Sequence, residues 1–97
     1  MNNFAWLEEW YLKHCNGEWE HAYGIKIETL DNPGWLVEID LLETRYAGLP
    51  NVEIKDEYQS DSDWLLCKIT NGIFRGSGDP EKLGVIIQVF RTWIENF

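Results

Sequence analysis

The sequence predicts an α+β fold, a two-layer sandwich in which an N-terminal and a C-terminal helix cover one face of an antiparallel sheet of four or five strands. Near both ends of the chain, apolar residues recur at spacings of three and four, which is typical of amphipathic helices. Between them, runs of alternating apolar and polar residues are separated by turns rich in Gly, Pro and Asn. With 97 residues and 44% apolar content, residues 1–97 are expected to form one domain with one core.

The first helix is expected to begin after a cap at Asn2 or Asn3 and to end near Cys15, because Asn16-Gly17 is a typical helix stop. Its apolar stripe consists of Phe4, Leu7, Trp10 or Tyr11, and His14.

A β-hairpin is predicted next, between residues 16 and 42. Residues 18–21 lead into a strand whose core side carries Tyr23, Ile25, Ile27 and Thr29. The turn is Asp31-Asn32-Pro33-Gly34, since Pro presets φ and Gly accepts a positive φ. In residues 35–42 the core side is Trp35, Val37, Ile39 and Leu41, and the opposite side is Leu36, Glu38, Asp40 and Leu42.

The rest of the sheet follows after a connection at residues 44–51. Residues 52–58 are expected to form a third strand, whose modest apolar content suits an edge, with Val52, Ile54, Asp56 and Tyr58 inward and Glu53, Lys55 and Glu57 outward. Residues 64–70 form a fourth strand with Leu65, Cys67 and Ile69 inward, and residues 73–75 a short fifth strand after the Asn71-Gly72 turn.

The last helix is expected to start at Asp79-Pro80-Glu81, which combines a cap, a Pro at the first helical position and an acid in the first turn. Its apolar face is Leu83, Ile86, Ile87, Phe90, Trp93, Ile94 and Phe97. If both helices cover one side of the sheet, the other side is open. The predicted strand phases place on it Lys26, Glu28, Glu38, Asp40, Glu53, Lys55, Glu57, Trp64, Leu66 and Lys68.

The formal net charge of −9 argues against direct nucleic-acid binding and favours encounter with a basic partner. No run is long enough to span a bilayer, and residues 1–15 carry Glu8, Glu9 and Lys13 where a signal peptide needs an uncharged core. The sequence therefore predicts a cytoplasmic protein without membrane attachment.

Few residues suggest chemistry. Cys15 and Cys67 are far apart and form no CxxC pair, so reduced thiols are expected instead of a disulfide or a zinc site. Glu20, His21 and Asp31 are the one acid and histidine group close in sequence, and a structural role for His21 is favoured over a catalytic one. No catalytic residue, metal or cofactor is predicted.

The six tryptophans fall into two groups. Trp10, Trp35 and Trp93 lie on predicted core faces, whereas Trp6, Trp19 and Trp64 are either exposed interface residues or imperfectly phased core residues.

A family resemblance extends over nearly the whole chain. It rests on Asn16 to His21 (NGEWEH), Tyr23-Gly24, Thr29 to Trp35 (TLDNPGW), Ile39-Asp40-Leu41, Thr44, Asp63-Trp64, Cys67, Phe74, Gly76, Gly78-Asp79-Pro80, Leu83, Phe90 and Trp93, with Trp6, Trp10 and Tyr11 before them. These residues resemble the immunity protein 53 family of bacterial polymorphic toxin systems. The family pattern has an acid before the glycine of NGEWEH, where this chain has Asn16. The resemblance implies a protein that binds and blocks a cognate toxin domain, without catalysis.

Three functional hypotheses follow. The first is an immunity protein whose acidic open face covers a basic, nuclease-type toxin, with partner-binding residues Glu28, Glu38, Asp40, Glu53, Glu57 and Trp64. The second is a small-ligand or regulatory domain with an aromatic pocket near Trp19, His21 and Trp35. The third is an enzyme built on Glu20, His21 and Asp31. The identity of the toxin and the oligomeric state stay open.

Overall fold

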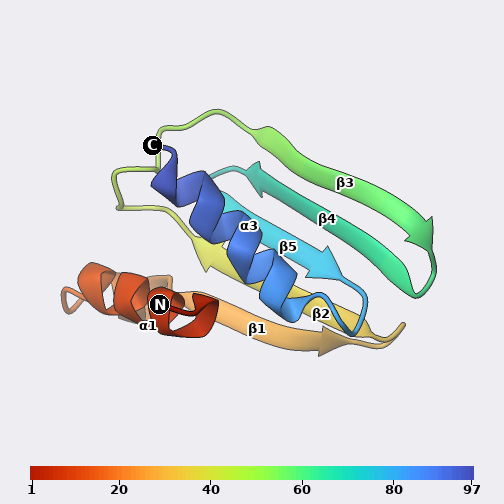
Figure 1. Cartoon of the computed structure of the whole chain (residues 1–97). Coiled ribbons are helices and arrows are strands. Elements are labelled where there is room, and N and C mark those ends of the chain that lie inside the picture. The colour runs from red at the N-terminus through yellow and green to blue at the C-terminus, as the bar shows by residue number, and fades with distance from the viewer.

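A computed structural model describes residues 1–97 and confirms the predicted α+β architecture. Three helices and five strands follow in the order α1 (Asn3–His14), α2 (Trp19–Ala22), β1 (Ile25–Leu30), β2 (Gly34–Asp40), β3 (Val52–Ser60), β4 (Asp63–Thr70), β5 (Ile73–Gly78) and α3 (Leu83–Glu95). The strands form one antiparallel sheet in the order β1-β2-β5-β4-β3, so β5 is central and β1 and β3 are the edges (Figure 1).

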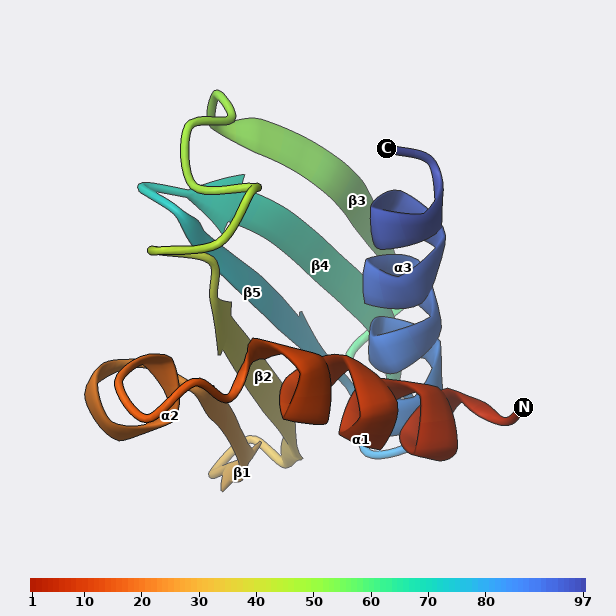
Figure 2. The ribbon, with the colours of Figure 1, turned by 90° about the vertical axis from the view of Figure 1, so that its left-hand side faces the viewer.

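Both long helices lie on one face of the sheet, and the other face carries no helix (Figures 1 and 2). Helix α3 lies over the middle strands, and α1 packs against α3. The Trp10 and Phe90 rings meet edge to face at 5.2 Å between centroids, which joins the two helices. The fully buried sheet residues include the predicted core positions Val37, Ile39, Cys67 and Ile69, together with Phe74 of β5.

The close contact between α3 and β5 depends on a glycine. A Cβ added at Gly76 would lie 2.3 Å from Cγ2 of Ile86 and 3.2 Å from the ring of Phe74. Only a residue without a side chain leaves room for the helix at this distance.

The start of α3 differs from the prediction. The helix begins at Leu83, and Asp79 stands before it with its side chain fully buried. The Asp79 carboxylate accepts hydrogen bonds from the backbone N–H groups of Glu81 (2.9 Å) and Trp64 (2.9 Å), as well as from Lys82 Nζ (2.6 Å). Asp79 therefore does not cap the helix. Its side chain links the Asp79–Lys82 turn to β4.

Helix α2 was not expected, because residues 18–21 were assigned to the lead into a strand. The Asn16 side chain accepts hydrogen bonds from the N–H groups of Glu18 and Trp19, and the Glu20 carboxylate accepts from those of Asn16 and Gly17. These bonds and the burial of Trp19, only 1% exposed, hold the turn of helix in place.

A β-bulge in β3 reverses part of the predicted strand phase. The pairing with β4 shifts between Glu53 and Lys55, so that Lys55 and Glu57 pair with the inward residues Cys67 and Leu65. Asp56 and Tyr58 pair with Leu66 and Trp64, which places them on the helix-free face. The predicted placement of Lys55 and Glu57 on the open face, and of Asp56 and Tyr58 inward, is wrong. One inserted residue changes the face of every residue after it.

Candidate partner interface

The helix-free face consists of rows of side chains that cross all five strands. Cross-strand register defines two complete rows. The first is Lys26, Glu38, Arg75, Lys68 and Glu53, and the second is Glu28, Leu36, Ser77, Leu66 and Asp56. The face is therefore mixed in charge and partly apolar, and less uniformly acidic than the sequence predicts.

Three of the predicted partner-binding acids already have partners within the chain. Glu38 pairs with Arg75, whose Nε and terminal nitrogen lie 2.9 and 2.5 Å from the same carboxylate oxygen. Glu28 lies 3.6 Å from Lys26 Nζ, and Asp40 accepts a hydrogen bond from the N–H of Leu42. A carboxylate with a partner of its own contributes less to the field that a toxin meets.

The carboxylates of this face that lack a basic partner lie mainly at its β3 edge, apart from Asp40 on β2. Glu53 and Asp56 of β3 have no basic nitrogen within 4.0 Å, and the same holds for Asp61 in the β3–β4 turn. Glu57, a predicted contact residue, pairs with Lys55 at 3.8 Å on the opposite face. The sequence missed Asp56 because nothing in it signals the bulge that turns this side chain outward.

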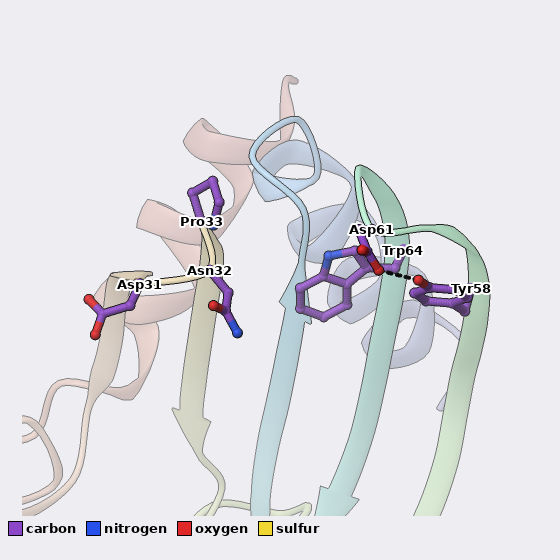
Figure 3. A pocket seen from close by; sticks show the side chains of 6 residues that line it. All are labelled: Asp31, Asn32, Pro33, Tyr58, Asp61 and Trp64. Carbon is purple, nitrogen blue, oxygen red and sulfur yellow. Dashed lines mark hydrogen bonds between the residues drawn. The ribbon is translucent and has the colours of Figure 1, made fainter.

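The predicted Trp64 lines the largest concavity of the molecule, a groove of about 650 Å³ at the end of the helix-free face. Its lining is Asp31, Asn32, Pro33, Tyr58, Asp61 and Trp64. Figure 3 shows the Asn32 side chain and the Trp64 ring on opposite sides of this groove, with the end of β5 between them. The groove exists because two hairpin turns far apart in sequence reach the same end of the sheet, which strand phase alone does not reveal.

One hydrogen bond organises the β3–β4 end of the groove. The Tyr58 hydroxyl donates to the Asp61 carboxylate, and this bond together with the nearby negative charge raises the pKa of Tyr58 above its usual value. The hydroxyl therefore stays protonated at neutral pH, and Asp61 keeps one carboxylate oxygen free of any protein donor.

Buried Asp79 fixes the backbone under the groove. It accepts the Trp64 N–H bond on β4 and the Lys82 ammonium before α3. The hydrogen bond from Lys82 is the main cause that lowers the pKa of Asp79 to about 2, and the same bond raises the pKa of Lys82 above its usual value. The pair stays ionised across the physiological range.

The other candidate groups do not converge. Glu20 and His21 precede β1, whereas Asp31 follows it, so the six residues of that strand separate them by about 20 Å. Hydrogen bonds from backbone N–H groups, its own and those of Asn16 and Gly17, hold the pKa of Glu20 below its usual value. These contacts give Glu20 a structural role in the turn.

The residues of the predicted aromatic ligand pocket also lie apart. Trp19 is buried against Trp10 and His14 near the start of β1, and the His21 side chain beside it is exposed. Trp35 pairs with Thr29 at the other end of the hairpin, and its indole N–H donates to the Pro80 carbonyl at 2.9 Å. The structure does not bring the three together.

One of the two free thiols lies in the core. Cys67 is fully buried, and desolvation raises its pKa to about 12, so the thiol stays protonated. No group of three or more His, Cys, Asp or Glu side chains is placed to hold a metal ion. None of the helices combines the length and apolar character needed to cross a membrane.

Comparison with family models decides the relationship of the chain. The model described as immunity protein 53 matches residues 4–95 of the 97. The chain belongs to the immunity protein 53 family. No curated protein and no solved structure matched it significantly.

Membership of the immunity protein 53 family confirms the resemblance seen in the sequence and supports a toxin-neutralising role. The matched range includes both hairpin turns of the groove and all of β3, the strand that carries the unpaired carboxylates. It also includes the NGEWEH segment. Hydrogen bonds within this segment stabilise the α2 turn, and its Trp19 is buried in the core.

Proposed function

We propose that this chain binds a cognate toxin domain and blocks it by covering a basic, nuclease-type surface with the helix-free face of its sheet. The observation that carries the proposal is the placement of carboxylates without basic partners beside the exposed Tyr58 ring and the half-buried Trp64 ring at the β3–β4 side of that face, in a member of an immunity family. The inhibitor acts by occupying the toxin surface, without catalysis and without a cofactor, in the cytoplasm.

The charge distribution supports this mode of action. A nuclease binds phosphate groups through Lys and Arg, and an acidic surface competes for the same positive potential. Asp56 and Glu53 face outward without internal partners, so their charges are available to a basic toxin. Charge complementarity of this kind accelerates encounter and fixes the orientation of the complex.

The proposal moves the centre of the predicted interface. Among the six residues predicted from the sequence, Glu53 and Trp64 keep a leading role, Glu28, Glu38 and Asp40 flank the interface, and Glu57 is excluded by its position. Asp56, Tyr58 and Asp61 join the proposed contact surface.

The bulge in β3 provides a matched test. Glu53→Lys and Asp56→Lys reverse charges on the helix-free face, whereas Glu57→Lys makes the same charge change on the same strand but on the opposite face. Binding to the toxin domain encoded beside this chain is measured by calorimetry at two salt concentrations. Each outward reversal is expected to weaken binding by roughly tenfold or more at low salt, because like charges then oppose each other.

Glu57→Lys is expected to leave the dissociation constant within about twofold of the original value, since it points away from the toxin. Equal losses for all three variants would overturn the choice of face. Full binding by the Glu53→Lys, Asp56→Lys double variant, shown to be folded by circular dichroism, would overturn it as well.

A further inference from the structure

The groove at the end of the helix-free face has the composition of a cation site. Its walls are the rings of Trp64 and Tyr58, and its ionisable groups besides Tyr58 are the carboxylates of Asp31 and Asp61. No Lys or Arg lines it. Lys82, which precedes α3, is bound by Asp63 at 2.9 Å and Asp79 at 2.6 Å, and no basic nitrogen lies within 4.0 Å of Asp31 or Asp61. The negative charge of the groove therefore has no counterion from the protein itself.

The geometry favours a flat cation over a compact one. Figure 3 shows the Trp64 ring beside the Asp61 carboxylate, with the Asn32 amide across the groove and Asp31 on the outer rim. A guanidinium group stacks its face on an indole and donates in its own plane to a carboxylate and an amide oxygen. An ammonium group can donate to the same oxygens, but it has no flat face to stack on the indole.

The groove is also rigid where the cation would rest. The Trp64 N–H donates to Asp79 at 2.9 Å, and the Asp79 N–H donates back to the Trp64 carbonyl at 3.3 Å. The buried Asp79 is itself held by Lys82 and by the Glu81 N–H. A ring mounted on a fixed backbone loses little conformational entropy when a partner binds, which is a property of interface hot spots.

We infer that this groove binds an arginine side chain of the toxin, stacked on Trp64 and bonded to Asp61, as the anchor of the complex. The inference rests on the proposed function and names the chemistry of its central contact. The volume of about 650 Å³ exceeds what one side chain fills, which leaves space for the toxin backbone on either side of the arginine. Acidic side chains elsewhere on the face, among them Asp56 and Glu53, then flank the anchor.

A small probe tests the groove without the toxin. N-acetyl-arginine methylamide is titrated into the isotopically labelled protein, and the indole N–H signal of Trp64, assigned with a Trp64→Phe variant, is followed by NMR. The uncharged isostere N-acetyl-citrulline methylamide is the matched control. The expected result is a saturable shift of the Trp64 signal with a dissociation constant in the millimolar range, with citrulline at least tenfold weaker.

The variant Asp61→Asn keeps the shape of the side chain and removes its charge. It is expected to weaken arginine binding at least threefold, whereas Glu57→Gln on the other face leaves binding unchanged. Equal shifts with arginine and citrulline, or shifts spread over the surface without saturation, would overturn the inference. Unchanged binding by Asp61→Asn would do so too.

A second arm separates this inference from the proposed function. Binding of the toxin domain is compared for Asp61→Asn and for Asp56→Lys. If Asp56→Lys weakens toxin binding and Asp61→Asn does not, the interface stands and the arginine anchor fails. If the arginine probe binds as expected but the toxin domain does not bind the chain at all, the proposed function fails and the groove remains a guanidinium site of another partner. A loss of roughly tenfold or more in toxin binding by both variants supports both.

Discussion

At the scale of single residues, Asp79 and Trp19 have roles that are set by contacts between segments distant in sequence. Asp79 looks like an ordinary helix cap in the sequence, and in the structure it is a buried carboxylate that joins β4 to the start of α3. Trp19, which the sequence left open between surface and core, is nearly fully buried. Whether such residues are buried, and which groups they bond, depends on contacts between segments distant in sequence, and local sequence patterns do not reveal those contacts.

The lowered pKa of Asp79, about 2 against an ordinary 3.8, makes a prediction about acid stability. Because the folded-state pKa lies below the unfolded one, the stabilisation is complete above about pH 4 and is lost as the pH falls toward about 2. Asp79→Asn is therefore expected to lower the Tm at pH 7, by roughly 5 to 10 °C, and to differ less from the original protein as the pH falls through this window.

Thermal unfolding followed by circular dichroism between pH 7 and pH 2 measures this difference. Asp31→Asn, an exposed acid without a close partner, is the control and should not change the Tm at pH 7. A gap between Asp79→Asn and the original protein that stays constant over the whole pH range would contradict the assigned role.

At the scale of elements, alternation and helical periodicity were sufficient to predict α1, β2 and β4 closely. The core sides of β2 and β4 are as expected, and so is the apolar face of α3 except for Phe97, which lies beyond the helix and is exposed. Burial on one side leaves a plain period in the sequence. The bulge in β3, the single turn α2 and the start of α3 were missed. Each depends on side-chain hydrogen bonds or on one extra residue, which leave no periodic signal.

The packing of α3 on β5 leads to a prediction at the same scale. Gly76→Ala is expected to destabilise the protein by about 1 to 3 kcal/mol, because the new methyl group would overlap Ile86 and Phe74. Gly84→Ala in α3 has nothing within 4 Å of the new Cβ and should stabilise by up to about 1 kcal/mol through helix propensity. Denaturant unfolding measures both changes, and equal stability of the two variants would contradict this account of the contact.

At the scale of the whole molecule, the sheet separates a helix-covered face from a helix-free face. One face is covered by α1 and α3 and holds the buried aromatic and aliphatic core. The other is free for a partner, and its unpaired charge is concentrated toward β3 and the groove. The two different faces and the family could be predicted from the sequence. The groove could not, because two hairpin turns meet there only in the folded sheet.

The central claim is that the toxin domain covers the helix-free face at the β3–β4 side and its groove. Hydrogen exchange of the amides, measured for the free chain and for its complex with the toxin domain, tests this claim most directly. The account predicts stronger protection in the complex for residues 52–66 and 31–34, with no change at the outer surfaces of α1 and α3. Protection confined to α1 and α3, with unchanged exchange in β3 and both hairpin turns, would contradict it.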